Sequence, residues 1–318
     1  MTTARAPAPW WRRRLPIPFA ALCLLGFALP WASARWPSPV GVAGWAIDLA
    51  AHWQWACAAI WIGLCLASAR RRRPWLAALP LALLPLWTAS PSLPAARDAV
   101  TPPTLVLASA NVHAGNADPA PLAAWLRAQP ADVVVLVELA PAYADGLQHA
   151  LAEAYPHHAF FAADSPFGIG LLSRLPLRDV TRSDSTDGIP SLAATIDTAQ
   201  GPVRVIAAHP MPPLAPHWQQ ARDDLLRSLA REARDRPTVV AGDLNATPWS
   251  RALADAARLG LRRATGLGPT WPSAHVGIPI DHVLAGPGWR RGETARGPDI
   301  GSDHRPIRAI LFLDGGAR

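Results

Sequence analysis

A short stretch in the last third of the chain constrains the fold more than any other. Residues 238–248 read Thr-Val-Val-Ala-Gly-Asp-Leu-Asn-Ala-Thr-Pro. The apolar run predicts a buried strand, and because side chains alternate along a strand, Asp243 and Asn245 point to the same side. Polar groups at the carboxyl edge of a buried strand are typical of functional sites in layered α/β proteins. A plain strand-end turn stays open at this point, since Gly, Asp and Asn are also common turn residues.

The region around this stretch alternates between predicted strands and helices. We predict strands around residues 105–111, 132–138, 160–161, 169–173, 192–196, 203–208, 239–245, 278–284 and 307–313. Predicted helices lie at about 119–128, 141–154, 214–233 and 249–259. Several strands follow one another without a helix between them, which favours two packed sheets flanked by helices over one doubly wound parallel sheet.

Polar or ionisable side chains stand at the ends, or inside, most of these predicted strands. They are Asn111, Glu138, His209, Asp243, Asn245, Asp281, Asp303 and His304. Such groups are costly to bury unless they pair with one another or bind a metal ion. Oxygen ligands and histidine without a thiolate favour Mg²⁺ or Mn²⁺ over a structural zinc ion. The predicted chemistry is metal-assisted attack of water on a phosphate ester.

The spacing of these residues resembles that of the endonuclease/exonuclease/phosphatase superfamily. The matching pieces are Asn111, Glu138, His209, Gly242-Asp243-x-Asn245, Ile280-Asp281-His282 and Ser302-Asp303-His304-x-Pro306. That superfamily includes deoxyribonuclease-like enzymes, abasic-site endonucleases, sphingomyelinases and inositol polyphosphate phosphatases. The resemblance spans about residues 104–314 in the family's order and leaves out residues 1–100. It implies a four-layer α/β/β/α sandwich and a Mg²⁺-dependent phosphoesterase, with Mn²⁺ as the other candidate ion.

The resemblance also implies a role for each matching residue. Glu138 would bind the metal ion, with Asn111 and Asp303 beside it. His282 matches a motif position as well, but we expect it to pack or to cap a strand.

Five further residues would act on the substrate. Asp243 would orient or deprotonate the attacking water, and Asn245 would hold a phosphate oxygen. His304 would contact the scissile phosphate, with Asp281 fixing its tautomer. His209 would stabilise developing charge or assist the leaving group. The sequence leaves open which residue is the general base.

The first hundred residues differ in charge from the rest of the chain. They hold 10 Arg against two acidic residues, a net charge of +8, whereas residues 101–318 hold 20 Arg against 21 acidic residues, a net charge of −1. The basic excess is therefore weak evidence for nucleic-acid binding, because the predicted catalytic part is nearly neutral.

Three apolar runs in this basic region predict membrane helices at about residues 15–34, 49–69 and 75–91. The first two have the roughly 20 residues that a bilayer requires, and the third is shorter and interrupted by prolines, so two or three transmembrane helices are expected. We expect Asp48, His52 and Gln54 to be polar residues at the membrane interface.

Arginine clusters at residues 12–14 and 70–73 favour the cytoplasmic side of the membrane. This topology predicts that the remaining chain lies on the periplasmic side of a bacterial inner membrane. A third run that re-enters the membrane would instead keep it in the cytoplasm. Residues 32–34, Ala-Ser-Ala, also resemble a signal-peptidase site.

We therefore predict a membrane region over residues 1–92, a linker over 93–103 and an endonuclease/exonuclease/phosphatase domain over 104–318. The predicted protein is a membrane-anchored, Mg²⁺-dependent phosphoesterase that hydrolyses a phosphodiester. Its substrate could be nucleic acid, a lipid head group or a small phosphate. A phosphatase and a non-catalytic binding module are the alternatives. The lipid bilayer is the expected partner, and no protein partner is inferred.

Overall fold

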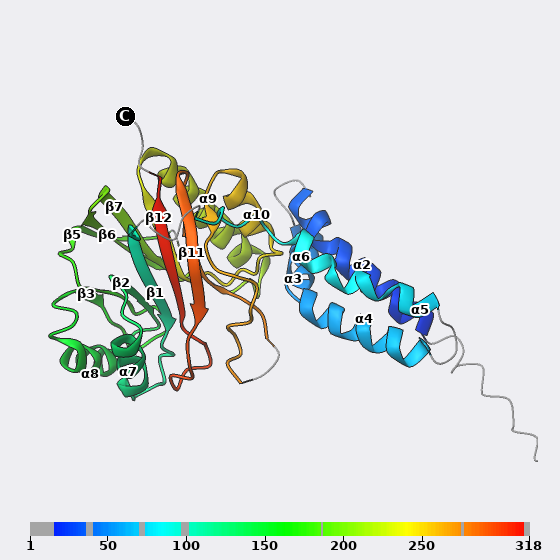
Figure 1. Cartoon of the computed structure of the whole chain (residues 1–318), viewed down its shortest axis with the longest axis horizontal. Coiled ribbons are helices and arrows are strands. Elements are labelled where there is room, and N and C mark those ends of the chain that lie inside the picture. Colours follow the sequence, from blue (N-terminus) through cyan, green and yellow to red (C-terminus); the bar gives the residue numbers. More distant parts are fainter. Residues whose placement is uncertain are drawn as a thin grey trace, which may run out of the picture.

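The computed structural model describes residues 16–35, 41–69, 74–96, 102–185, 187–274 and 277–314. A region of helices precedes residue 90, and an α/β domain follows residue 102; the two lie at opposite ends of the long axis in Figure 1. The two arginine clusters that suggested the membrane topology, at residues 12–14 and 70–73, lie outside the described residues.

The α/β domain is built on two six-stranded mixed sheets. The first has the order β11 (Trp289–Arg296), β12 (Ile307–Leu313), β1 (Leu105–Asn111), β2 (Val133–Val137), β4 (Ile169–Ser173) and β3 (His157–Phe161). The second has the order β5 (Arg178–Asp184), β6 (Pro190–Thr198), β7 (Gly201–Ala208), β8 (Thr238–Asp243), β10 (Asp281–Ala285) and β9 (Arg262–Arg263). Strands β1 and β2 are parallel, as are β7 and β8, and the other pairs are antiparallel.

The two sheets pack face to face, and helices cover their outer faces. Val135, Val205 and Val239 belong to the apolar core between the sheets. Helices α7 (Ala120–Ala128) and α8 (Pro141–Leu151) pack on the first sheet, and α9 (Pro216–Asp235) and α10 (Arg251–Arg258) pack on the second. The central strands are apolar along their whole length because both of their faces are covered. The predicted four-layer α/β/β/α sandwich is confirmed.

The sequence patterns did not predict three of the strands: β5, β9 and β11. Every residue of β5 is exposed, and β11 carries four charged residues in its eight. All three lie at sheet edges. Charged side chains at an edge prevent pairing with other chains, and they also remove the apolar alternation by which a strand is recognised.

The helical region differs from the three predicted membrane helices. It contains α2 (Pro16–Arg35), α3 (Gly41–Ala51), α4 (Gln54–Ala69), α5 (Pro74–Ala77), a 3₁₀ turn η1 (Leu79–Leu83) and α6 (Leu84–Thr88). Within the described ranges, one helix window is long and apolar enough to cross a membrane, Pro18–Arg35. Helices α3 and α4 pass the same test only as a pair, with a bend of 62° between them.

Two of the helix bounds in this region differ from the predicted ones. The second predicted helix was to start at residue 49, but the chain is helical from Gly41 and breaks at His52 and Trp53. The third predicted helix is divided into α5, η1 and α6, because Pro74, Pro80 and Pro85 each lie in the first turn of one of these pieces.

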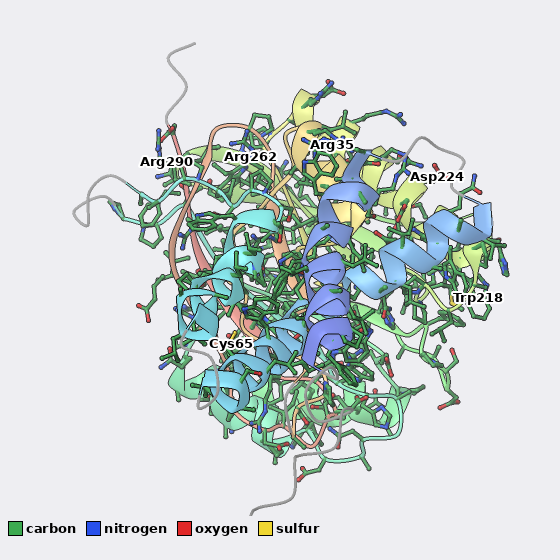
Figure 2. All side chains as sticks on the ribbon, turned by 90° about the vertical axis from the view of Figure 1, so that its right-hand side faces the viewer. Arg35, Cys65, Trp218, Asp224, Arg262 and Arg290 are labelled. Atoms are coloured by element: carbon green, nitrogen blue, oxygen red, sulfur yellow. The ribbon has the colours of Figure 1, made fainter. Side chains whose placement is uncertain are left out.

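Helices α2 and α4 pack against each other and extend away from the α/β domain (Figure 1), whereas α3 lies across the domain beside α9, near the labelled Trp218 and Asp224 (Figure 2). Indole groups connect the two regions, because Trp55 Nε1 donates to Leu267 O at 3.0 Å and Trp249 Nε1 donates to Pro85 O at 2.8 Å. The helical region is thus docked on the α/β domain through specific hydrogen bonds.

Asp48, His52 and Gln54 do not lie at an exposed membrane interface as expected. All three are buried. Asp48 accepts hydrogen bonds from Arg222 Nη2 at 2.9 Å and from the Arg251 amide at 2.7 Å. His52 Nδ1 faces the Thr247 amide at 3.3 Å. The expectation failed because the α/β domain, which lies far away in sequence, covers this part of the helices.

Candidate active site

The register of the strands brings the predicted site residues to one edge of the sandwich. Asn111, the last residue of β1, pairs with Val137 of β2, so Glu138 follows directly beside it. Asp243 of β8 and Asp281 of β10 are cross-strand partners. His209 follows β7, which is parallel to β8.

A cavity of about 550 Å³ opens at this edge. Six of the eight predicted residues line it: Glu138, His209, Asp243, Asn245, Asp303 and His304. The other two, Asn111 and Asp281, are buried directly behind and hydrogen-bonded to members of this set. The structure therefore brings all eight residues together, although they are spread over nearly two hundred positions.

Local backbone geometry around the cavity explains some of the residue types. Gly242 has a φ of +145°, and a Cβ atom there would lie 2.0 Å from the carbonyl oxygen of Ala208. Only glycine lets β8 pass this close to β7. Glu138 and Asn245 have φ values of +56° and +48°, which non-glycine residues rarely adopt and which cluster at functional sites.

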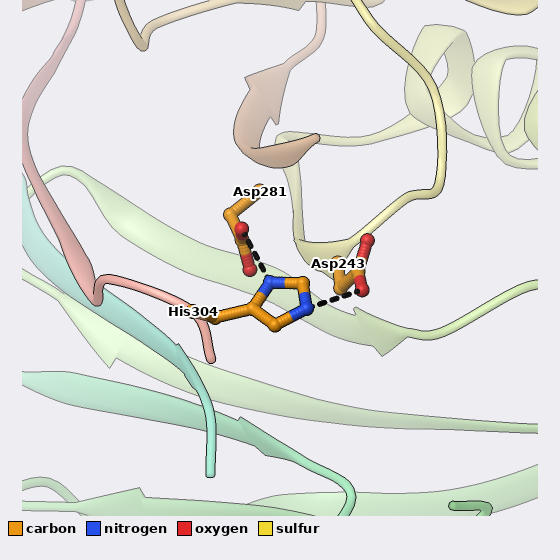
Figure 3. A group of neighbouring side chains, drawn as sticks. All are labelled: Asp243, Asp281 and His304. Atoms are coloured by element: carbon orange, nitrogen blue, oxygen red, sulfur yellow. Dashed lines mark hydrogen bonds and ion pairs between the residues drawn. The ribbon is translucent and has the colours of Figure 1, made fainter. Parts of the chain in front are cut away.

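His304 lies between two carboxylates (Figure 3). Its Nδ1 is 2.9 Å from Asp281 Oδ2, and its Nε2 is 3.6 Å from Asp243 Oδ2. Burial disfavours the charged imidazolium, but Asp281 and Asp243 outweigh it and raise the pKa of His304 to about 10. Both ring nitrogens of His304 thus face carboxylate oxygens, and the short contact with Asp281 holds the orientation of the ring.

Asp243 stays ionised despite its burial. Burial alone would raise its pKa, but the positive charge of His304 and the contact with His209 lower the pKa of Asp243 to about 2. The Asn245 amide also donates to Asp243 Oδ1 at 2.9 Å. Asp281 differs, because burial raises its pKa more than the neighbouring His304 lowers it.

His209 lies on the other side of Asp243. Its Nε2 is 3.6 Å from Asp243 Oδ2 and 3.9 Å from Glu138 Oε1, and its Nδ1 faces the Pro166 carbonyl at 3.1 Å. Burial opposes protonation of the ring, but the two carboxylates outweigh it and raise the pKa of His209.

Hard oxygen donors gather at the remaining side of the cavity. Asn111 Nδ2 donates to Glu138 Oε1 at 2.8 Å. His113 links two carboxylates, with Nδ1 3.8 Å from Glu138 Oε2 and 3.6 Å from Asp303 Oδ1. Two carboxylates and a carboxamide are a donor set that suits Mg²⁺ or Mn²⁺.

A second group, Asp243, Asp281 and His304, also has ligand atoms within 4.8 Å of one another. Both nitrogens of His304 already face carboxylates there, as described above. Protonated, such a ring has no lone pair for a metal ion. The site around Glu138 and Asp303 therefore fits a metal ion better.

Sequence reasoning missed some residues of the site. His113 is an exposed loop residue after β1 that no sequence pattern marked, and its ring lies close to both carboxylates of the donor set. Trp271 lines the cavity and donates from Nε1 to Asp303 Oδ2 at 3.0 Å. His282 is buried between Thr265 and the Ala246 carbonyl, in agreement with the packing role we expected.

Residues of the helical region were missed as well. Leu49, His52 and Trp53 line the same cavity. They lie in an apolar run that composition alone assigned to a membrane helix, so no sequence signal marked them.

Comparison with known proteins agrees with this geometry. Residues 108–304 match the model of the Endonuclease/Exonuclease/phosphatase family, which is more than half of the chain. The chain belongs to this family. Its members are metal-dependent phosphoesterases, and the chain is an enzyme of that class. No curated protein sequence matches the chain significantly.

Several solved structures share the fold. An endonuclease/exonuclease/phosphatase from Beutenbergia cavernae is 24% identical with a TM-score of 0.58, over 67% of this chain and 72% of that one. D. rerio TDP2 complexed with a single-strand DNA product is 19% identical with a TM-score of 0.54, over 66% and 99%. A Staphylococcus aureus beta toxin mutant with bound magnesium ions is 16% identical with a TM-score of 0.51, over 65% and 99%.

Proposed function

We propose that this chain is a membrane-anchored phosphodiesterase that uses Mg²⁺ to hydrolyse its substrate by attack of water. The observation that carries this proposal is the meeting of Glu138, Asp243 and His304 around one cavity. The family supports phosphoester chemistry, and the apolar helix α2 supports the anchor.

Glu138 and Asp303, with Asn111 behind them, are the residues that would hold the metal ion. A bound divalent ion supplies positive charge that stabilises the phosphate oxygens as negative charge develops on them. Magnesium is favoured by the all-oxygen donor set and by the ions bound in the related beta toxin.

Asp243 orients the attacking water in this proposal, because it is ionised at neutral pH and lines the cavity. His304 donates a hydrogen bond from its protonated ring to a phosphate oxygen. Asn245 Nδ2 donates to the Pro210 carbonyl at 2.9 Å, which fixes the amide so that its second N–H is available to the phosphate. His209 lies beside Asp243 and Glu138, where it can protonate or stabilise the leaving oxygen.

A diester is favoured over a monoester by the charge of the cavity. A phosphate monoester carries nearly two negative charges at neutral pH, and a diester carries one. None of the described residues that line the cavity is an arginine, and the chain has no lysine. Histidines and the metal ion are thus the sources of positive charge, which suits the lower charge of a diester.

Hydrolysis of bis-p-nitrophenyl phosphate by the full-length chain tests the proposal. We expect turnover with Mg²⁺, loss of turnover with EDTA and recovery when Mg²⁺ is added back. Glu138→Gln should lower kcat at least about a hundredfold, whereas Glu153→Gln, at an exposed position after α8, should not change it. Equal activity of the two variants would contradict the assignment of Glu138.

The position of the catalytic domain on the periplasmic side is also part of the proposal. Fusions after Ser92 to two reporters, one active only in the cytoplasm and one only outside it, test this topology. Activity of the cytoplasmic reporter alone would place the domain inside the cell and leave the proposed chemistry unaffected.

A further inference from the structure

The catalytic cavity has one wall that the α/β domain does not provide. Leu49, at the end of α3, and Trp53, at the break between α3 and α4, line it together with the catalytic residues. The opposite wall includes the segment 210–214, Pro-Met-Pro-Pro-Leu, and Phe167. Trp45 of α3 donates from Nε1 to Pro213 O at 2.8 Å, so the two walls are held together.

Helix α3 presents opposite characters on its two sides. Gly44 and Asp48 are buried, and Asp48 binds the α/β domain. Val42, Ala46 and Ala50, which recur every four residues, are exposed. Asp48 is the only polar residue of α3, so its exposed side is apolar and suits contact with a membrane better than contact with water. The bend of 62° after α3 then leads into α4, which extends away from the domain beside α2.

The mouth of the cavity continues this apolar surface. Among the described residues, nineteen large hydrophobic side chains are exposed, and fifteen of them belong to the helical region. Only four belong to the α/β domain, and two of these, Phe167 and Leu214, line the cavity. Trp53 is 46% exposed and Leu214 is 66% exposed, so the cavity opens where the apolar surface of the helices ends.

We infer that the space between these two walls, with Leu49 and Trp53 on one and Phe167 and residues 210–214 on the other, is an apolar subsite for the hydrocarbon part of a lipid phosphodiester. This inference rests on the proposed function, because it places the phosphate at Asp243 and His304. The hydrocarbon part lies between Trp53 and Leu214 and passes from there to the exposed apolar surface of the helices. The absence of arginine from the described cavity lining favours this occupant over a nucleic acid, whose many phosphates require a basic surface.

Two esters with the same leaving group test the inference: methyl p-nitrophenyl phosphate and octyl p-nitrophenyl phosphate. The full-length chain is kept in amphipol, so that no detergent competes for the subsite. We expect kcat/KM to be at least tenfold higher for the octyl ester, since burial of only two extra methylenes corresponds to about tenfold. Trp53→Ser and Leu214→Ser should each lower the octyl-to-methyl ratio at least fivefold.

The matched control is Trp87→Ser. Trp87 is 78% exposed on α6 and does not line the cavity, so this variant should keep the wild-type ratio. A ratio that is near one in the wild type, or that falls equally in Trp53→Ser and Trp87→Ser, would overturn the apolar subsite. Hydrolysis of both esters in that case would leave the proposed function standing.

Two further measurements separate the remaining outcomes. The first uses thymidine 5′-p-nitrophenyl phosphate. If the enzyme prefers this ester to the octyl ester, and if Trp53→Ser abolishes the preference, then Trp53 belongs to a base-stacking surface and the inference is overturned. If neither alkyl ester is hydrolysed with Mg²⁺, the proposed function fails, and calorimetry then decides the subsite. Tenfold tighter binding of octyl phosphate than methyl phosphate, lost in Leu214→Ser, would support it, and equal binding would overturn it.

Discussion

The helical region and the α/β domain both bury charged and polar side chains, but for different purposes. In the α/β domain, Asp243 and His304 are buried at the wall of a cavity. In the helical region, Asp48 is 0% exposed and faces the other domain. Asp48 accepts from Ser33 Oγ at 2.7 Å as well as from Arg222 and the Arg251 amide.

This difference separates a buried charge that docks two regions from buried charges to which we assign the chemistry. All the hydrogen bonds described for Asp48 are to other groups of the protein. The side chains of Asp243 and His304, in contrast, also face the cavity. An acidic residue in an apolar segment is often taken for part of a transport path. In this chain the folded domain supplies its partner, so the residue has a structural explanation.

The hydrogen bonds that dock the helical region extend to Asn245 of the candidate site. Arg222 donates from Nη1 to Asn245 O at 2.8 Å while its Nη2 binds Asp48. Burial disfavours its charge, but Asp223 and Asp48 outweigh this effect and raise the pKa of Arg222. An excised α/β domain would lack Asp48 and one wall of the cavity. Activity is therefore best measured on the full-length chain.

The largest expected effect tests the catalytic side of this comparison. His304→Ala should lower kcat about a thousandfold or more, because in the proposed mechanism it removes the hydrogen-bond donor to the phosphate. His158→Ala changes an exposed histidine of β3 and serves as the control. Steady-state kinetics with bis-p-nitrophenyl phosphate and Mg²⁺ provide the measurement. Similar kcat values for the two variants would exclude His304 from the reaction.

The second-largest effect tests whether Asp48 stabilises the contact between the helical region and the α/β domain. Asp48→Asn should destabilise the full-length chain by about 3 kcal/mol, because it leaves the buried Arg222 without one of its two charged partners. Asp224→Asn removes an exposed partner of Arg227 and should change stability by less than about 1 kcal/mol. Thermal unfolding midpoints of both variants provide the comparison. A midpoint for Asp48→Asn as high as that of Asp224→Asn would mean that the buried contact does not hold the regions together.

The smallest effect concerns His282, a buried histidine that neither docks the two regions nor takes part in the proposed reaction. Burial, together with the charge of Arg263, lowers its pKa to about 3 in the folded protein. The unfolded value is about 6.5. His282 is therefore neutral in both states above pH 6.5, and below that pH the unfolded state gains a proton that the folded state does not. Stability is lost as the pH falls, by about 2 kcal/mol at pH 5.

Melting of wild type and His282→Gln at pH 7.5 and pH 5.0 measures this effect. The wild-type Tm should fall further than that of the variant. Because the other titrating groups are common to both proteins, an equal fall in Tm would show that His282 is not kept neutral by the fold.

The sequence by itself determined the two-sheet architecture of the α/β domain and marked the eight polar residues that the structure brings to one cavity. Continuous apolar strands can only be buried on both faces, and Asn111, Glu138 and Asp243 stand where such strands end. These are local patterns, so they can be read without knowing which segments meet. The charged edge strands β5 and β11 were missed because an edge does not need the apolar alternation that reveals a strand.

Only the tertiary structure decided what the helical region does. Composition indicated an apolar anchor, but the break at His52 and Trp53, the pairing of Asp48 with Arg222 and the wall at Leu49 all depend on contacts between distant segments. Asp48 and Arg222 lie 174 positions apart. Whether a carboxylate in an apolar helix faces lipid, water or a guanidinium depends on what packs against it, and that is a property of the folded chain.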